Sequence, residues 1–296
     1  MTELRPSQMT AEVKARSTNE AGEELTTAVI TLARSALAEL NTHRAFSRNS
    51  ASSRAIPAHK MIAAVRANPY IPRAFGLKGK GMAPSRLVEY GTDEWAKIAR
   101  WWVQSMEDAT ASVEEGLNLG VHKQDVNRIL EPFMMHTVVV SSTEWENFFR
   151  QRTEIDPDTN KPLAYLPIYD AAVALQEAMR AAPEAVQRRT TGPDSWHLPL
   201  LREGERESLS LEDARLVSVA RSARVSYFSD DGIVHLEENG KSVEDELALA
   251  DRLLRSMKEQ APHASPFEHV AQAAPAVRSG NFLGWRQFRD QVMGQR

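Results

Sequence analysis

Residues 42–54 read Thr-His-Arg-Ala-Phe-Ser-Arg-Asn-Ser-Ala-Ser-Ser-Arg. Hydroxyl, amide and guanidinium groups dominate this stretch, and no helical or strand period of apolar residues runs through it, so the building of a core does not explain it. Arginine is a planar, permanently charged donor suited to phosphate and carbonyl oxygens, and serine and asparagine add neutral hydrogen bonds. The stretch predicts either a binding loop for a phosphorylated ligand or a polar surface loop.

Positive charge is concentrated around the same stretch. No Asp or Glu occurs between Asn41 and Arg86, although the whole chain has a net charge of -4. The basic residues of this region are Arg44, Arg48, Arg54, Lys60, Arg66, Arg73, Lys78, Lys80 and Arg86. Such a local excess suits a phosphorylated ligand, but it also fits a solvated basic loop or a nucleic-acid surface over residues 42–86. A nucleic-acid surface would be expected to offer more aromatic residues for base stacking than Phe46, Tyr70 and Phe75.

Composition narrows the functional classes. The 296 residues are 42% hydrophobic and 26% charged, as in an ordinary soluble protein. The absence of cysteine excludes disulfides, thiolate metal sites and a cysteine nucleophile. Because no apolar run approaches the roughly 18 residues of a membrane span, and no signal-peptide core is present, we expect a cytoplasmic protein without membrane contact.

The pattern of apolar and turn residues predicts a mobile tail over residues 1–22 and one domain over 23–296. Within this domain, residues 23–182 and 209–296 are two parts joined by a connector over 183–208. A strand leading into a helix is expected over 26–40, and further strands over 225–228 and 270–277. Helices are expected near 60–66, 92–106, 123–130, 143–152, 168–179, 210–223 and 242–257. Thr92 and Ser210 are candidate N-caps, and Thr143 with Glu146 fits a capping box.

Three further segments have functional patterns. Residues 263–269 read His-Ala-Ser-Pro-Phe-Glu-His, residues 221–227 read Arg-Ser-Ala-Arg-Val-Ser-Tyr, and an Arg-x-x-x-Pro turn from Arg128 precedes a helix with Asn-Phe-x-x-x-Arg ending at Arg152. The two histidines around Glu268 could be zinc ligands or a structural pair. Their spacing, interrupted by Pro266, does not present ligands on one helix face, so no metal site is predicted.

Together these segments resemble the flavin-dependent thymidylate synthases. His43, Arg44 and Ser52 keep the spacing of that family's Arg-His-Arg…Ser signature, and residues 263–269 are similar to its His-x-Ser/Thr-Pro-Phe-Glu-His element. Two positions depart: Thr42 stands where the family usually has arginine, and Ser50 where it usually has glutamate. The order also departs, because the segments at 221–227 and 263–269 normally precede the Arg-His-Arg signature. The chain therefore resembles a circularly permuted type, associated with bacteriophage genomes.

Permutation suggests a source for the missing arginine. In the usual order a strand leads from the His-Pro-Glu-His element into the Arg-His-Arg signature, and here that strand ends at Gln287 and Arg289. Arg289 is therefore expected to supply the charge that Thr42 lacks. Arg286 should point away from Gln287, because side chains alternate along a strand. The alternative is a merely basic C-terminal end.

The resemblance implies an α+β fold, a mostly antiparallel sheet with a helical layer, assembled as a homotetramer with shared active sites. It implies the reductive methylation of dUMP to dTMP, with FAD as cofactor and methylenetetrahydrofolate and NADPH as cosubstrates. The catalytic residue it implies is Arg152. Substrate binding is implied for Arg44, Ser50, Ser52, Arg54, Arg128 and Gln287, and cofactor binding for His43, Arg44, Asn49, Asn147, His263, Ser265 and Arg289. A non-catalytic scaffold and a nucleic-acid-binding protein are the alternatives.

Overall fold

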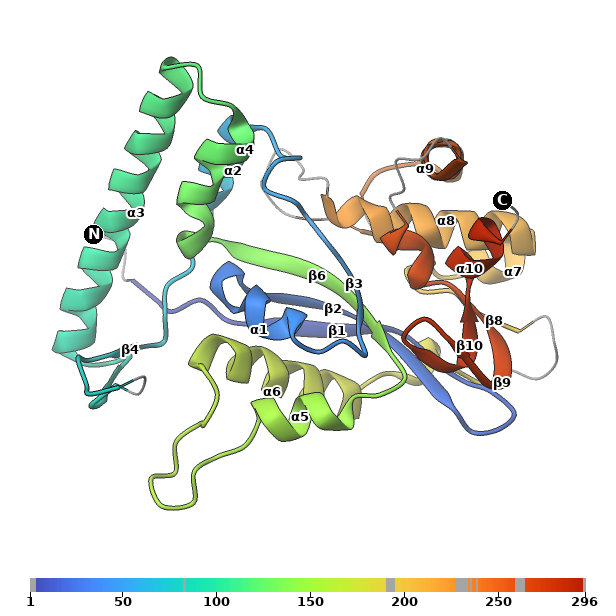
Figure 1. The fold of residues 1–296 in the computed structure, drawn as a ribbon, viewed down its shortest axis with the longest axis horizontal. Helices are drawn as coiled ribbons and strands as arrows, with labels where there is room; N and C mark the ends of the chain where they lie inside the picture. Colours follow the sequence, from blue (N-terminus) through green and yellow to red (C-terminus); the bar gives the residue numbers. More distant parts are fainter. Residues whose placement is uncertain are drawn as a thin grey trace.

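The computed structural model describes residues 4–81, 84–189, 195–226, 234, 236–237, 239–258 and 264–294. Its largest sheet has five strands in the order β3-β6-β2-β1-β7. These strands are β1 (Thr10–Thr18), β2 (Glu24–Ala33), β3 (Ser47–Ser50), β6 (Met135–Ser142) and β7 (Gln187–Arg189). Figure 1 shows β1, β2, β3 and β6 of this sheet. All neighbours in this sheet are antiparallel except β1 and β7. The mixed α+β architecture with antiparallel sheets agrees with the expected fold class.

Two smaller sheets complete the strands. One has the order β10-β9-β8, with β8 (Trp196–His197), β9 (Ala271–Ser279) and β10 (Phe282–Gln287), and the other pairs β4 (Ala74–Gly76) with β5 (Leu87–Glu89). The helical elements are η1 (Arg34–Ala36), α1 (Leu37–Asn41), α2 (Ala58–Ala67), α3 (Asp93–Asn118), α4 (Lys123–Val126), η2 (Asn127–Phe133), α5 (Glu146–Arg152), α6 (Leu166–Arg180), η3 (Glu184–Val186), α7 (Glu205–Ser208), α8 (Leu211–Ala223), η4 (Arg224–Ser226), α9 (Val243–Lys258), η5 (Ser265–Glu268) and α10 (Phe288–Met293). None of the helices in the described ranges is long and apolar enough to cross a membrane.

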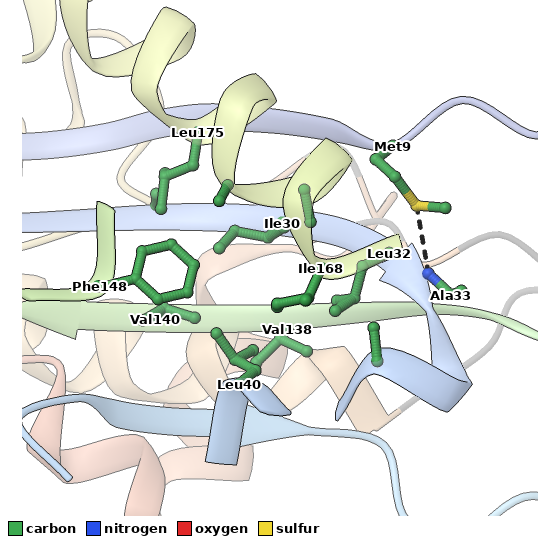
Figure 2. Packing of buried hydrophobic residues seen from close by; sticks show 14 of the residues in the cluster. Met9, Ile30, Leu32, Ala33, Leu40, Val138, Val140, Phe148, Ile168 and Leu175 are labelled. Carbon is green, nitrogen blue, oxygen red and sulfur yellow. Dashed lines mark hydrogen bonds between the residues drawn. The ribbon is translucent and has the colours of Figure 1, made fainter. Parts of the chain in front are cut away.

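The central strands β2 and β6 are buried on both faces. On one face Ile30 and Val138 pack against Ile168 and Leu175 of α6, with Phe148 of α5 beside them (Figure 2). On the other face Val139 packs against Leu200 and other apolar residues of the C-terminal part. Burial of each such side chain contributes roughly 1.5–3 kcal/mol to folding. The sheet therefore holds the helical layer of α5 and α6 on one side and the C-terminal part on the other.

The predicted N-caps form at the start of two helices. The hydroxyl of Thr92 accepts a hydrogen bond from the Trp95 amide at 3.1 Å, at the start of α3. The hydroxyl of Ser210 accepts one from the Asp213 amide at 3.1 Å, at the start of α8. Each satisfies one of the amides that a helix start leaves without an internal partner.

Four sequence expectations need correction. Residues 10–18 are not a mobile tail but strand β1, whose Val13, Ala15 and Ser17 are buried against the fold. The capping box at α5 does not form, because the helix starts after Trp145 and Thr143 instead accepts a hydrogen bond from the Leu283 amide at 3.1 Å. Of residues 225–228, expected to form a strand, 225 and 226 belong to the 3₁₀ helix η4, and 227–228 lie outside the described residues. The expected connector carries the short elements η3, β7, β8 and α7.

Strand β10 is attached to the hairpin between β1 and β2. The side-chain amide of Asn19 donates to the Gly284 carbonyl at 2.9 Å, and the Trp285 indole donates to the Glu23 carbonyl at 3.2 Å. Gly284 has a φ of 79°, and a Cβ there would lie 2.0 Å from a carboxylate oxygen of Glu23. The positive φ favours glycine at this position, where β10 lies against the hairpin of β1 and β2.

Candidate functional site

A cavity of about 600 Å³ lies between segments from the two ends of the sequence. One wall consists of β3, the loop after it and the start of α2, and the other of the ends of α8 and η4 with α9 and η5. The residues that line it are Asn49, Ser50, Ser52, Arg54, Ala55, Ile56, Pro57, Lys60, Ala223, Ser226, Leu253, Ser265 and Pro266. Five residues expected to bind substrate or cofactor therefore share one cavity: Asn49, Ser50, Ser52, Arg54 and Ser265.

Asn49 connects the two walls. Its side-chain Nδ2 donates to the Ser222 carbonyl at the end of α8 at 2.6 Å, and its Oδ1 accepts from the Ser265 hydroxyl at 3.1 Å. Strand β3 holds Asn49 in place through antiparallel pairing with β6, where Asn49 is opposite Val139. The asparagine thus fixes η5 and α8 against the edge of the large sheet.

Polar and apolar side chains both line the cavity. Ser50, Ser52 and Arg54 present hydroxyl groups and a cation, whereas Ala223, Leu253 and Pro266 present apolar surface. Arg54 is exposed and forms no hydrogen bond or ion pair with any residue in the described ranges. A cation and hydroxyl groups suit a phosphate, and an apolar wall suits a planar ring system. The cavity therefore fits a nucleotide-like ligand.

A second group of predicted residues meets beside Thr42. Arg152, at the end of α5, donates from Nε to His43 Nε2 and from Nη2 to the Thr42 hydroxyl, both at 3.1 Å. The rings of Phe46 and Phe148 pack on His43, with centroids 5.7 and 4.9 Å away. The position that lacks the family's usual arginine is therefore in contact with Arg152. Arg289, which is expected to supply the charge missing at this position, forms an ion pair with Glu268 of η5.

Burial, together with the positive charges of Arg152 and Arg48, lowers the pKa of His43 to about 4. His43 is therefore neutral at physiological pH, and its Nε2 accepts the hydrogen bond from Arg152. Arg48, which the sequence patterns did not single out, donates to the backbone carbonyls of His43 at 2.9 Å and Leu40 at 3.2 Å. It holds the turn that presents His43.

The remaining predicted residues lie elsewhere. Arg44 is exposed, Arg128 donates from Nε to the Gln124 backbone carbonyl at 3.1 Å, and Asn147 Oδ1 accepts from Arg150 Nη2 at 3.1 Å. None of these three is among the described residues that line the cavity. His263 lies outside the described residues.

The C-terminal pair occupies different surroundings from those expected. Gln287 is buried, and its side-chain amide donates to the Ser47 hydroxyl at 3.0 Å, so it contacts β3 without lining the cavity. Arg286, its neighbour on β10, is exposed, as the alternation predicts. Arg289 lies on α10, not on a strand, and forms an ion pair with Glu268 of η5. Both residues thus contact site-bearing elements rather than the cavity itself.

Within the described ranges, no group of three or more His, Cys, Asp or Glu residues could hold a metal ion. No protein-family model matches the sequence, and no curated protein matches it either. Two solved structures resemble the fold, both of the UMP/dUMP methylase PolB from Streptomyces cacaoi, bound with 5-Br dUMP and with 5-Br UMP. Each is 18% identical and covers 62% of this chain and 92% of that chain, with TM-scores of 0.46 and 0.47. A likeness of this extent shows neither the family nor the activity of the chain.

Proposed function

We propose that the protein is an FAD-dependent thymidylate synthase that methylates dUMP with methylenetetrahydrofolate. The observation that carries this proposal is the contact between Asn49 and Ser265, which are 216 positions apart in the chain. Each belongs to a separate segment resembling the enzyme family, and the two line one cavity with Ser52 and Arg54. Segments that serve unrelated purposes would have no reason to meet at one cavity.

The position of Gln287 supports the permuted motif order. The end of β10 lies beside the start of β3, where Gln287 and Ser47 are joined by a hydrogen bond of 3.0 Å. In a chain with the usual motif order, the segment that contains β10 would continue directly into the segment that contains β3. Chain ends are tolerated at such a junction when the flanking segments stay paired.

The residues around the cavity fit FAD. Asn49 and Ser265 would hold the cofactor from the two walls. His43, in the turn that precedes β3, would contact the cofactor as well. The apolar surface of Ala223, Leu253 and Pro266 suits a flat ring system. Bound FAD, reduced by NADPH, would supply the hydride. In the overall reaction the one-carbon group of methylenetetrahydrofolate and this hydride would together form the methyl group that replaces the C5 proton of dUMP, with release of tetrahydrofolate and NADP+.

The protein's own groups supply binding and charge stabilisation. With no cysteine in the chain, a thiolate cannot activate the uracil ring. Ser52 and Arg54 would hold the nucleotide phosphate. Arg152, whose guanidinium is oriented by Thr42 and His43, would stabilise negative charge on the pyrimidine as its C5 reacts.

One alternative is weakened by burial. Phe46, Tyr70 and Phe75, the aromatic residues of the basic region, are only 2%, 4% and 9% exposed. They are therefore not available for stacking on nucleic-acid bases. A non-catalytic scaffold is the other alternative, and a turnover measurement separates it from the enzyme.

The test is dTMP formation by the purified full-length protein. With dUMP, methylenetetrahydrofolate, NADPH and FAD present, we expect dTMP together with release of tritium from the labelled C5 of dUMP. Omission of FAD after the protein has been stripped of flavin should abolish both signals. Binding of dUMP and FAD without any dTMP would identify a scaffold and overturn the proposal.

A further inference from the structure

The cavity loop over residues 51–56 has two faces. Ser52, Arg54 and Ala55 are exposed and line the cavity, whereas Ala51 and Ser53 are buried and do not line it; Ile56 is buried but reaches the cavity as well. A turn closes the loop, with the Ala55 amide donating to the Ser52 carbonyl at 2.9 Å. The conformation of the ligand-facing side chains therefore depends on what holds the buried face.

Asn127, at the start of η2, holds this buried face. Its side chain is 0% exposed, and its Nδ2 donates to the Ser53 carbonyl at 2.7 Å and to the Ile56 carbonyl at 3.0 Å. One amide group thus binds two carbonyls on either side of Arg54. Because the amide is planar and buried, the two bonds fix the separation and direction of this part of the loop.

Glu131 adds a second attachment one turn further along η2. A carboxylate oxygen of Glu131 accepts a short hydrogen bond from the Ser53 hydroxyl and pairs with Arg34 Nη2 at 3.3 Å. Arg34 in turn donates from Nη1 to His136 Nε2 on β6 at 2.8 Å. The chain of contacts connects the loop to the central sheet, which is the most deeply buried part of the fold.

We propose that Asn127 and Glu131 are positioning residues that set Ser52 and Arg54 for binding the phosphate of the substrate. This inference rests on the proposed function for the identity of the substrate, dUMP. Neither residue lines the cavity itself. Asn127 and Glu131 act from behind the loop, whereas their neighbour Arg128 points its Nε to the backbone of its own helical turn.

The test compares Asn127→Asp and Asn127→Ala with the wild-type protein. Asn127→Asp keeps the size of the side chain but replaces the donor with an oxygen, which repels the two loop carbonyls. We expect the KM and the Kd for dUMP to rise about tenfold in both variants, the change that corresponds to about 1.4 kcal/mol. The kcat at saturating dUMP should fall less than threefold, because Arg152 is untouched, and FAD affinity should stay within about twofold.

Thr110→Ala is the matched control for lost stability. Thr110 is also 0% exposed, but its hydroxyl donates to the Met106 carbonyl within α3 at 2.9 Å and not to a carbonyl of the loop. This variant should lower the Tm without changing the KM for dUMP. Glu131→Ala removes the carboxylate that accepts the hydrogen bond of the Ser53 hydroxyl, and it should raise the KM for dUMP several-fold. This variant replaces the Asn127 variants in the test if those fail to fold.

Hydrogen exchange gives a readout that does not depend on the substrate. The amides of residues 51–56 should exchange faster in Asn127→Ala than in Thr110→Ala at equal loss of Tm. Unchanged dUMP affinity and unchanged loop exchange in the Asn127 variants would overturn the inference. Failure of the wild-type protein to bind dUMP would instead contradict the proposed function, and the exchange measurement would still decide whether Asn127 holds the loop.

Discussion

The guanidinium of Arg152 is held by two side chains that precede it by about 110 positions, Thr42 and His43. A hydrogen bond to neutral His43 orients the arginine without neutralising it, since the imidazole carries no charge at physiological pH. Because residue 42 is a threonine, this position does not bring a second positive charge against Arg152. The residue that departs from the family pattern therefore becomes part of the support of the proposed catalytic residue.

Arg152→Ala tests this role. We expect kcat for dTMP formation to fall roughly a hundredfold or more, the size of effect seen when a preorganised charge-stabilising donor is removed. FAD binding should change little. Arg150→Ala is the control, because Arg150 is an exposed arginine of the same helix whose side chain donates to Asn147. Near-wild-type turnover of Arg152→Ala at saturating dUMP would show that the substrate helix has been misassigned.

At the scale of elements, a buried polar chain joins the large sheet to the C-terminal part. Thr27 of β2 contacts Ser141 of β6 at 2.5 Å and His197 of β8 at 2.7 Å. Ser141 in turn contacts His269 Nδ1, just after η5, at 2.8 Å. His269 ends the segment that carries Ser265, so this chain of hydrogen bonds also orients one wall of the cavity.

Burial of these imidazoles predicts acid sensitivity. The pKa values of His136, His197 and His269 fall to about 3, chiefly through desolvation, and that of His43 to about 4. Below pH 6.5 the unfolded chain binds protons that the folded chain does not, so the free energy of unfolding falls as the pH falls toward these folded values. Each histidine contributes a slope approaching roughly 1.4 kcal/mol per pH unit.

Urea unfolding measured between pH 6.5 and 5 checks this expectation, because most carboxylates titrate below that range. The free energy of unfolding should decline steadily across it. In His269→Gln the free energy of unfolding should fall less steeply with falling pH, because the variant has one fewer histidine that binds a proton on unfolding. A free energy of unfolding that stays constant over this range would show that the histidines are not held neutral in the folded protein.

The sequence predicted the elements whose signals are local. The caps at Thr92 and Ser210 require only the residues of one helical turn, and both form. Strand β1 was missed because its buried face carries the small or polar residues Ala15 and Ser17, which hide the alternation. The sequence predicts a strand through Arg289, but β10 ends at Gln287 and Arg289 lies on α10, where its ion pair with Glu268 is a long-range contact that no local pattern encodes.

The same distinction applies to the site. Asn49, Ser52 and Ser265 were found through spacing patterns, and the structure brings all three to one cavity. The role of Asn127 could not be read from spacing, because a single asparagine on a helical turn resembles any surface polar residue until its two carbonyl partners are known. Residues that bind a ligand leave a pattern in sequence more readily than residues that hold the binding loop.

At the scale of the whole molecule, β3 is the element on which the two halves of the chain converge. Ser47 accepts a hydrogen bond from Gln287 of β10, and Asn49 accepts one from Ser265 of η5. The antiparallel pairing of β3 with β6 attaches it to the central sheet. In Figure 1 the orange and red C-terminal elements lie together beyond β3, on the side away from α3. The proposed cofactor site therefore exists only when the first and last parts of the chain are assembled.

Titration of the flavin-free protein with FAD tests this account most directly. We expect saturable quenching of flavin fluorescence with a Kd in the micromolar range or tighter, and a weakening of roughly tenfold or more in Asn49→Ala, which loses the contacts to Ser222 and Ser265. Arg286→Ala, at an exposed position of β10, should bind FAD like the wild type. A folded wild-type protein that leaves the fluorescence of FAD unchanged at saturating concentrations would contradict the assignment of the cavity to a flavin.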